Sequence, residues 1–181
     1  MSRVAVPGRD DAPDASKALL DAVQRRLGFV PNLFRLMGSH PAVLQGYTAL
    51  ADALTGVFDA RMRERIGLAL AQQAGCEYTL AEHRYLALNV AHLYPEEIDL
   101  NRHGGSTDPQ AAAAVTFALQ VARLRGRVDD AQLAAVREAG FSDAQIVGLV
   151  ALVAANQMTQ MLNAMARTEI DFPALRAEDV L

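Results

Sequence analysis

The 181-residue chain has little cysteine, little lysine and no long apolar run, and each shortage excludes a class of protein. Its one cysteine, Cys76, can form neither an intrachain disulfide nor a cysteine-rich zinc site. Its one lysine, Lys17, lies in a polar N-terminal segment, which argues against a buried Schiff-base lysine. The longest strongly apolar run, residues 146–155, is far shorter than the ~20 residues that a membrane-spanning helix needs.

The composition is typical of one globular domain. Hydrophobic residues make up 51% of the chain and charged residues 21%, which excludes the disordered class. The net charge of −4 argues against nucleic acid as a partner, because a surface that binds nucleic acid is basic. The first residues, MSRVAVPGRDDAP, lack the apolar core of a signal peptide. Together with the single cysteine, this predicts a cytoplasmic protein.

Apolar residues recur at helical spacing along most of the chain, and no stretch alternates with a period of two over more than a few residues. The sequence therefore predicts an all-α fold of about seven helices, with residues 1–15 as a flexible N-terminal arm and residues 16–181 as one domain. Helix starts are marked by Asp59, Asp108 and Ser142, the last of which begins a capping box. The longer helices are expected at about 16–26, 41–58, 60–74, 76–93, 109–125 and 142–168, and short ones after Pro95 and Asp129.

One row of residues points to chemistry. Cys76, Thr79 and His83 are spaced i, i+3 and i+7, which places a thiol, a hydroxyl and an imidazole on one helix face. If Gly75 ends the preceding helix, Cys76 lies in the first turn of its own helix, where the helix dipole favours the reactive thiolate. An antiparallel hairpin that turns at Gly75 brings Glu64 to within about one helical turn of the level of His83. We therefore expect the Glu64 carboxylate to orient the His83 ring and raise its basicity.

Distance leaves two interpretations of this row open. Cys76 and His83 are ~10 Å apart along the helix axis, so a proton path between them requires Thr79, a water molecule or a kink. In the other interpretation, Cys76 is a small buried residue and His83 is a core histidine with satisfied hydrogen bonds.

A second polar row lies in the long C-terminal helix, which is otherwise apolar. Asn156, Gln160 and Asn163 share one face of it. These amides are suited either to line a pocket that binds a substrate carbonyl or carboxylate, or to form hydrogen bonds between helices or subunits.

The segment GCEYTLAEH resembles the Cys-x-x-Cys-x-x-x-His motif of the AhpD-like family, which contains alkylhydroperoxidases and carboxymuconolactone decarboxylases. Family members also carry a Glu twelve residues before the first Cys, and Glu64 stands at that position. The segments GFVPNLFRLMGSHPAVLQGY and GFSDAQIVGLVALVAANQMTQMLNAMARTEIDFP are similar to the lead-in and to the closing helix and tail of peroxidase-related members. The likeness covers about residues 27–173.

The resemblance implies an AhpD-like helical domain in a homo-oligomer, often a trimer or hexamer, with no cofactor and no metal. In the peroxidase members it implies two motif cysteines that cycle between dithiol and disulfide, with Glu and His relaying protons. Here Thr79 replaces the second cysteine, and a hydroxyl cannot form a disulfide. A one-cysteine cycle stays open, in which Cys76 becomes a sulfenic acid that an external thiol resolves.

Three functions follow for these residues. In the first, the chain is a thiol-dependent hydroperoxide-reducing enzyme with Cys76 as nucleophile, His83 as base through Thr79 or water, and Glu64 as the group that orients His83. In the second, it is a decarboxylase-like acid–base enzyme that uses His83 and Glu64 on a small carboxylated lactone, with Thr79 binding substrate. In the third, it is a non-catalytic oligomer that binds a ligand. No partner among nucleic acids or membranes is expected in any of them.

Overall fold

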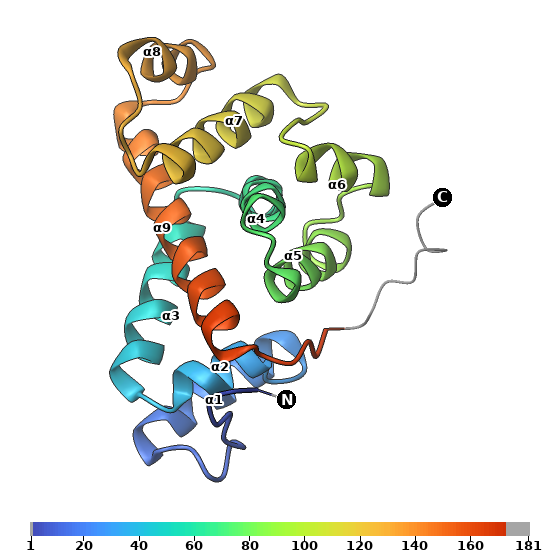
Figure 1. Cartoon of the computed structure of the whole chain (residues 1–181), viewed down its shortest axis with the longest axis vertical. Coiled ribbons are helices and arrows are strands. Elements are labelled where there is room, and N and C mark those ends of the chain that lie inside the picture. Colours follow the sequence, from blue (N-terminus) through green and yellow to red (C-terminus); the bar gives the residue numbers. More distant parts are fainter. Residues whose placement is uncertain (1, 173–181) are drawn as a thin grey trace.

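A computed structural model gives the fold over residues 2–172, and these residues form nine α-helices and no strand (Figure 1). The helices are α1 (Asp14–Leu27), α2 (Asn32–Gly38), α3 (Pro41–Thr55), α4 (Ala60–Ala74), α5 (Glu77–Asn89), α6 (Pro95–Arg102), α7 (Pro109–Leu124), α8 (Asp130–Glu138) and α9 (Asp143–Ala166). The predicted all-α class is confirmed. The helix number exceeds the expected seven because short helices such as α2 stand as separate elements.

Helix α4 is the centre of the fold. In Figure 1 it is seen end-on, and α5, α6, α7 and α9 all pack against it. Its eight consecutive residues 64–71 are all buried, so α4 has no solvent-facing side over these two turns. Two of the eight, Glu64 and Arg65, are charged, and each therefore needs a partner from a neighbouring helix.

Helix caps confirm the predicted starts. The side chain of Asp59 accepts a hydrogen bond from the backbone N–H of Met62 at the start of α4, and Asp108 does the same for the first turn of α7. Ser142 and Gln145 form the predicted capping box of α9. These caps satisfy N–H groups that a helix leaves unpaired, so local sequence alone determines where these three helices begin.

The α4–α5 hairpin turns at Gly75, whose φ of +61° is a left-handed conformation that glycine adopts without strain. Cys76 is the residue that precedes α5, and the helix itself begins at Glu77 and ends at Asn89. The predicted helix over 76–93 was therefore too long at both ends. The hairpin brings the face of α5 that carries His83 against the middle of α4.

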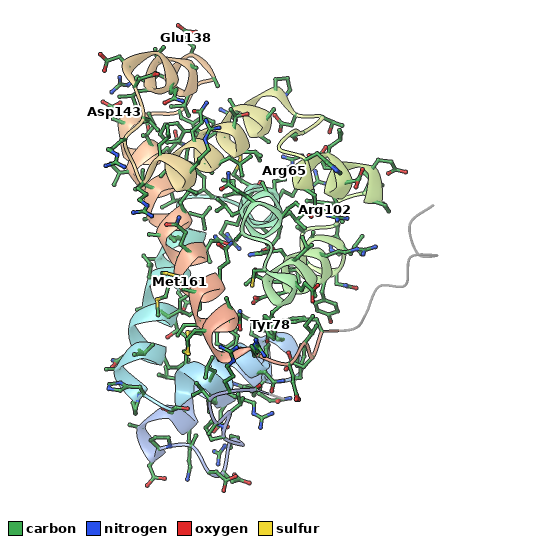
Figure 2. All side chains as sticks on the ribbon, viewed as in Figure 1. Arg65, Tyr78, Arg102, Glu138, Asp143 and Met161 are labelled. Atoms are coloured by element: carbon green, nitrogen blue, oxygen red, sulfur yellow. The ribbon has the colours of Figure 1, made fainter. Side chains whose placement is uncertain are left out.

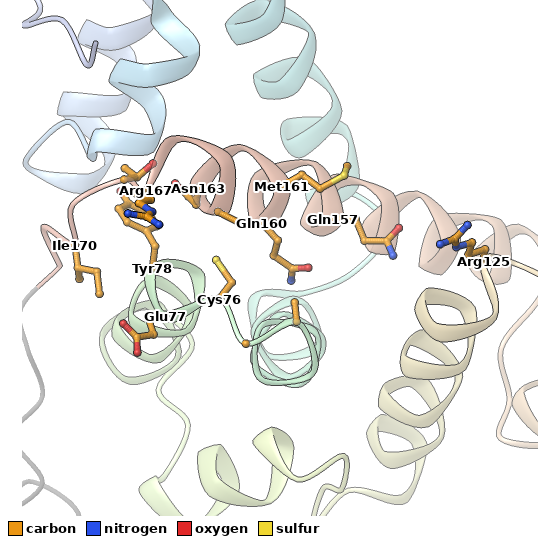
Figure 3. A pocket seen from close by; sticks show the side chains of 14 residues that line it. Cys76, Glu77, Tyr78, Arg125, Gln157, Gln160, Met161, Asn163, Arg167 and Ile170 are labelled. Atoms are coloured by element: carbon orange, nitrogen blue, oxygen red, sulfur yellow. The ribbon is translucent and has the colours of Figure 1, made fainter. Parts of the chain in front are cut away.

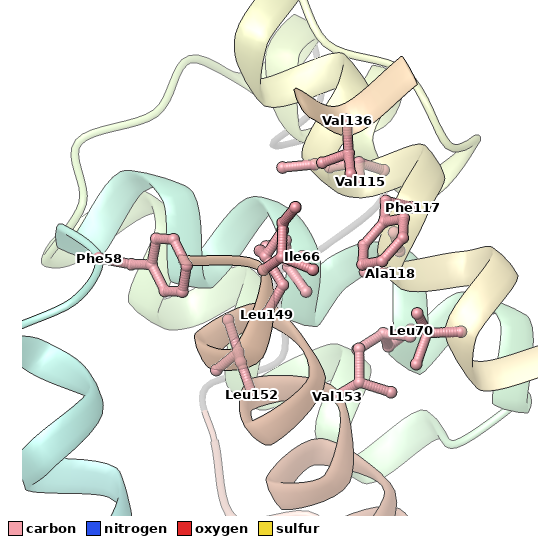
Figure 4. Packing of buried hydrophobic residues seen from close by; sticks show 14 of the residues in the cluster. Phe58, Ile66, Leu70, Val115, Phe117, Ala118, Val136, Leu149, Leu152 and Val153 are labelled. Carbon is pink, nitrogen blue, oxygen red and sulfur yellow. The ribbon is translucent and has the colours of Figure 1, made fainter. Parts of the chain in front are cut away.

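Apolar side chains fill the space between these helices. The cluster in Figure 4 joins α3, α4, α7, α8 and α9, with Ile66 and Leu149 in its middle and Phe58 at one side. A second cluster joins α1, α2 and α3 to the start of α5 and includes Cys76. These two clusters together hold α9 in place along its length. The inner face of α9 consequently lies opposite the start of α5.

The N-terminal segment, predicted as a flexible arm, is mostly exposed over its described residues 2–13 but contacts the helices at some points. Ala12 is 4% exposed. The guanidinium of Arg35 donates hydrogen bonds to the carbonyl oxygens of Val6 and Pro7. At the other end, Asp171 accepts hydrogen bonds from the backbone N–H of Asn32 and from the Tyr78 hydroxyl, whereas the last part of the predicted domain, 173–181, lies outside the described residues.

Helix α9 is the one helix in the described part of the chain that has the length and composition of a membrane-spanning segment. Half of its most apolar window is buried inside the fold, and it packs against α2, α3, α4, α5 and α7. This burial is the pattern of a core helix in a globular domain.

Arg65, the second charged residue of the buried stretch 64–71, lies on the central helix (Figure 2) and is paired by α6 and by the loop before α7. Its Nε lies 2.9 Å from an oxygen of Glu97, and its Nη1 lies 3.4 Å from Asp108. Arg65 and Glu97 are 9% and 5% exposed. A buried ion pair therefore connects α4 to α6, and such a pair is costly when one partner is removed.

Hydrogen bonds hold the Glu97 carboxylate in its ionised form. Burial alone raises the pKa of this carboxyl, but hydrogen bonds from Ser106 and Thr107, with a further one from Asn101, lower it from 4.5 to about 2. Because the folded-state pKa is depressed, this pairing stabilises the fold above the unfolded pKa of 4.5, and the stabilisation is lost as the pH falls through about 2.

The variant Glu97→Gln is expected to lower the free energy of unfolding by about 3 kcal/mol near neutral pH, because Arg65 then stays buried without its main partner. The loss should shrink towards pH ~2, where the native carboxyl also protonates. Urea unfolding across this pH range, with the exposed neighbour Glu96→Gln as the control, measures both effects. Equal stability of the two variants at neutral pH would contradict the role of this ion pair.

Candidate active site

Cys76 lines a pocket between the α4–α5 turn and the inner face of α9 (Figure 3). This pocket has a volume of about 790 Å³. The Cys76 residue is 8% exposed, and Figure 3 shows its sulfur pointing towards α9. No side chain caps the first turn of α5. The free N–H groups of that turn therefore lie where they stabilise a negative charge beside Cys76.

His83 is held by two hydrogen bonds from two different helices. Its Nδ1 lies 2.8 Å from Oε2 of Glu64 on α4, and its Nε2 lies 2.9 Å from Oδ1 of Asn156 on α9. The Asn156 amide nitrogen donates to the carbonyl oxygen of Leu152, which fixes the amide orientation and leaves Oδ1 to accept from the ring. Both ring nitrogens thus face acceptors, so the geometry favours the doubly protonated imidazolium.

Electrostatics support the charged ring. Burial opposes a charged imidazolium most strongly, but the hydrogen bond and charge of Glu64, with smaller contributions from Glu82 and Asn156, outweigh it and raise the pKa of His83 above 6.5. His83 and Glu64 therefore form a buried ion pair at the contact between α4 and α5. The predicted Glu64–His83 contact is present, and it forms within one chain.

The imidazole occupies space that only a glycine on α4 leaves free. A Cβ at Gly67 would lie 2.3 Å from Cε1 of His83 and 2.4 Å from Nδ1, far inside van der Waals contact. Gly67 therefore lets α4 and α5 approach closely enough for Glu64 to reach the ring. This role of Gly67 could not be predicted from the sequence, because a glycine within a helix can have many other causes.

Glu82 is a further buried carboxyl in this region, and sequence reasoning missed it. It is 8% exposed and forms no hydrogen bond or ion pair with the described residues. Burial raises its pKa from 4.5 to about 7. The charge of His83 lowers the pKa, and the charges of Glu64 and Asp171 raise it. Two carboxyls thus face one imidazolium, and Glu64 holds the direct hydrogen bond.

The predicted site residues fall into two groups. Glu64 and His83 meet in the ion pair, whereas Cys76 faces the pocket, and His83 is not among the residues that line that pocket. Thr79 is fully buried, and its hydroxyl donates to the backbone carbonyl of Cys76 at 3.3 Å. That hydroxyl makes no hydrogen bond to His83 within the described structure. The expected path from Cys76 through Thr79 to His83 is therefore not formed in this conformation.

The amide row of α9 is divided between the two groups. Asn156 binds the His83 ring, while Gln160 and Asn163, one and two turns further along, line the Cys76 pocket. The helical spacing predicted that these three amides share one face of α9, but it did not predict that they contact two different groups. No group of three or more His, Cys, Asp or Glu residues suited to a metal ion occurs among the described residues.

Comparisons with known proteins identify one family model and several solved structures that are similar to this chain. A model of the carboxymuconolactone decarboxylase family matches residues 41–124, which include Glu64, Cys76, Thr79 and His83. No curated protein matches the chain by sequence. One solved structure that is similar to this chain has an alkylhydroperoxidase AhpD core and is a peroxidase-related protein from Ralstonia eutropha JMP134. It is 26% identical in sequence, and the two structures match with a TM-score of 0.82 over 94% of this chain and 92% of that one.

Two more distant structures share the fold. A peroxidase-related protein from Silicibacter sp. TM1040 is 19% identical, with a TM-score of 0.80, over 93% of this chain and 91% of that one. The debrominase Bmp8, solved in complex with 2,3,4-tribromopyrrole, is 18% identical, with a TM-score of 0.77, over 94% of each chain. At these identities the likeness establishes the AhpD-like fold and leaves the chemistry to the residues of the site.

The variant Glu64→Gln is expected to lower the pKa of His83 below that of the native chain, because it removes the carboxylate that holds the imidazolium. The folded-state pKa is raised in the native chain. The stabilisation by this pair is therefore complete below about 6.5 and is lost as the pH rises through the folded pKa. NMR titration of the histidine ring protons measures the shift, with the solvent-exposed His103 as an internal reference. An unchanged His83 titration would contradict the pairing.

The variant Glu82→Gln is expected to stabilise the fold by about 2 kcal/mol at pH ~8, because it removes a carboxyl that must ionise inside the protein. The folded pKa of about 7 lies above the unfolded 4.5, so ionisation lowers stability as the pH rises between these values. The gain should vanish below about pH 4.5. Thermal unfolding against pH measures it, with the exposed Glu77→Gln of the same helix as control. A gain that is independent of pH would count against the buried carboxyl.

Proposed function

We propose that this chain, which a model of the carboxymuconolactone decarboxylase family matches over residues 41–124 and which has an AhpD-like fold, is an enzyme that reduces organic hydroperoxides with the thiol of Cys76. The observation that carries this proposal is the position of the pocket. The pocket opens on Cys76 and not on His83. A substrate that enters it therefore meets a thiol first.

The state of His83 argues against the acid–base alternative on a lactone. Both of its ring nitrogens already donate to acceptors of the protein, so the ring has no lone pair with which to take a proton from a substrate. A general base must lie within hydrogen-bond reach of the proton it removes. Cys76 meets the corresponding requirement for a nucleophile, because it lines the pocket.

The proposed reaction needs one cysteine and two equivalents of an external thiol. The Cys76 thiolate attacks the terminal oxygen of the hydroperoxide. A sulfur–oxygen bond forms, the oxygen–oxygen bond breaks, and the departing alkoxide takes a proton to become the alcohol. One external thiol then attacks the sulfenic acid of Cys76, forming a mixed disulfide and releasing water. A second external thiol attacks the mixed disulfide, which releases Cys76 as a thiol and forms the external disulfide. The two external thiols thereby supply the two electrons that reduce the hydroperoxide.

Glu64, His83 and Thr79 have positioning roles in this proposal. The buried His83–Glu64 pair joins α4 to α5, and its bond to Asn156 joins both to α9, so it fixes the helices between which the pocket opens. Its positive charge lies on the same helix as Cys76, ~10 Å along the axis. The Thr79 hydroxyl holds the Cys76 carbonyl and thereby the backbone that carries the thiol.

The native chain is expected to reduce cumene hydroperoxide with dithiothreitol as the external thiol, and Cys76→Ser is expected to lose at least about 100-fold of that turnover. Dimedone should label the native chain after one equivalent of peroxide and should not label the variant, because only a sulfenic acid reacts. Thr79→Val keeps the shape of the side chain and removes only a positioning contact, so it should lower turnover by no more than about tenfold. Full turnover by Cys76→Ser, or no turnover by the native chain, would falsify the proposal.

A further inference from the structure

Buried polar atoms without a hydrogen-bond partner gather at the Cys76 pocket. Among the described residues, five side chains contain such atoms: Arg65, Asn101, Gln160, Asn163 and Thr168. The first of these, Arg65, has its ion pair with Glu97, and Asn101 uses its amide nitrogen for two hydrogen bonds elsewhere. The other three all line the pocket that opens on Cys76.

These three residues are deeply buried and come from one short stretch of chain. Gln160 is 7% exposed, Asn163 is 3% exposed and Thr168 is 8% exposed. Gln160 and Asn163 lie on successive turns of α9, and Figure 3 shows Gln160 reaching from that helix towards Cys76. A buried amide with no partner costs free energy of folding. A cluster of three at one pocket therefore indicates groups whose partner is a ligand.

The unpartnered atoms define what that ligand must offer. The amide nitrogens of Gln160 and Asn163 are donors, the amide oxygen of Asn163 is an acceptor, and the Thr168 hydroxyl is both. All three side chains are uncharged. A complementary group is therefore neutral and carries a donor and an acceptor side by side, as a hydroperoxide or hydroxyl group does.

The charges around the pocket lie away from these amides. Glu77, Arg125 and Arg167 line it too, but all three are exposed to solvent. Hydrated charges at a rim attract ions only weakly. Apolar groups of Met161 and Ile170 also line the pocket and offer a surface for a hydrocarbon tail. The inner end is thus polar and neutral.

We infer that Gln160, Asn163 and Thr168 form a subsite that binds the neutral –OOH group of an alkyl hydroperoxide beside Cys76. This inference rests on the proposed function and adds to it the residues that bind the reacting group. The hydroperoxide O–H donates to the Asn163 amide oxygen, and the peroxidic oxygens accept from the amide N–H groups. These N–H groups then lie where negative charge develops on the leaving oxygen as the oxygen–oxygen bond breaks.

A binding experiment without redox chemistry tests the subsite directly. The probe is 2-phenyl-2-propanol, the alcohol that corresponds to cumene hydroperoxide, and the readout is the side-chain NH₂ resonances of the nitrogen-labelled chain. The resonances of Gln160 and Asn163 should shift saturably, and they should do so in Cys76→Ser as well. The anion 2-phenylpropionate should bind at least about threefold more weakly, because the amide oxygen of Asn163 repels a carboxylate.

Substitution separates binding from packing. Gln160→Met and Asn163→Leu keep the side-chain volume and remove the amide, and each should weaken binding of the alcohol by about 3- to 10-fold. Each should also raise Tm by about 2–4 °C, because an unpartnered buried amide is removed. The matched control is Gln157→Met, which lies on the same helix and pocket but is only half-buried, and it should change neither quantity appreciably.

The outcomes distinguish this inference from the proposed function. If the two variants weaken alcohol binding but the native chain reduces no hydroperoxide, the subsite is supported and the proposed peroxidase activity is refuted. If the native chain turns over hydroperoxide but its amide resonances do not respond to the alcohol, the subsite is refuted and the peroxidase proposal is retained. The same conclusion follows if the two variants keep the native KM for cumene hydroperoxide. Tighter binding of 2-phenylpropionate than of the alcohol also overturns it, because the site then prefers an anion.

Discussion

The burial of the middle of helix α4, residues 64–71, is the constraint on which the rest of the structure depends. A helix that is surrounded by four others cannot turn a charged side to water, yet α4 carries Glu64 and Arg65 next to each other in its buried middle. Adjacent helical residues point about 100° apart, so the two charges must be satisfied in different directions. Arg65 is paired by Glu97 from α6, and Glu64 by His83 from α5. Each pair therefore specifies which neighbour packs on which side of the central helix.

This arrangement has a chemical consequence. A histidine that neutralises a buried carboxylate, and whose second nitrogen also meets a fixed acceptor, is held as a cation and cannot act as a free base. Its contribution is the geometry and the positive charge that it gives to α5. Cys76, which directly precedes the same helix, lines the pocket. The thiol thus lies at the start of α5 and the imidazole in its middle, and only the imidazole takes part in the ion pair.

Local signals in the sequence were sufficient for much of the fold. The caps at Asp59 and Ser142, and the left-handed turn at Gly75, depend on hydrogen bonds and backbone angles within a few residues. The Glu64–His83 contact was also predictable, because a hairpin of known turn position aligns two helices. Glu82 and Gly67 were not predictable in the same way. Whether a carboxyl is buried, or a glycine faces a ring, depends on the packing angle of three helices, and no short stretch of sequence specifies that angle.

The polar groups of the core and the polar groups of the pocket differ in whether they have hydrogen-bond partners within the chain. Around α4, Glu64, Arg65 and Asn156 all find partners within the chain, as expected for groups that serve the fold. On the pocket side of α9, Gln160 and Asn163 are just as deeply buried and find none. Selection for stability alone would favour apolar residues of the same size at these two positions, since the loss of an unpaired amide is favourable. These two residues lie one and two turns beyond the fully satisfied Asn156, on the same face of α9. Their presence there is therefore consistent with a helix that stabilises the core up to Asn156 and binds a ligand beyond it.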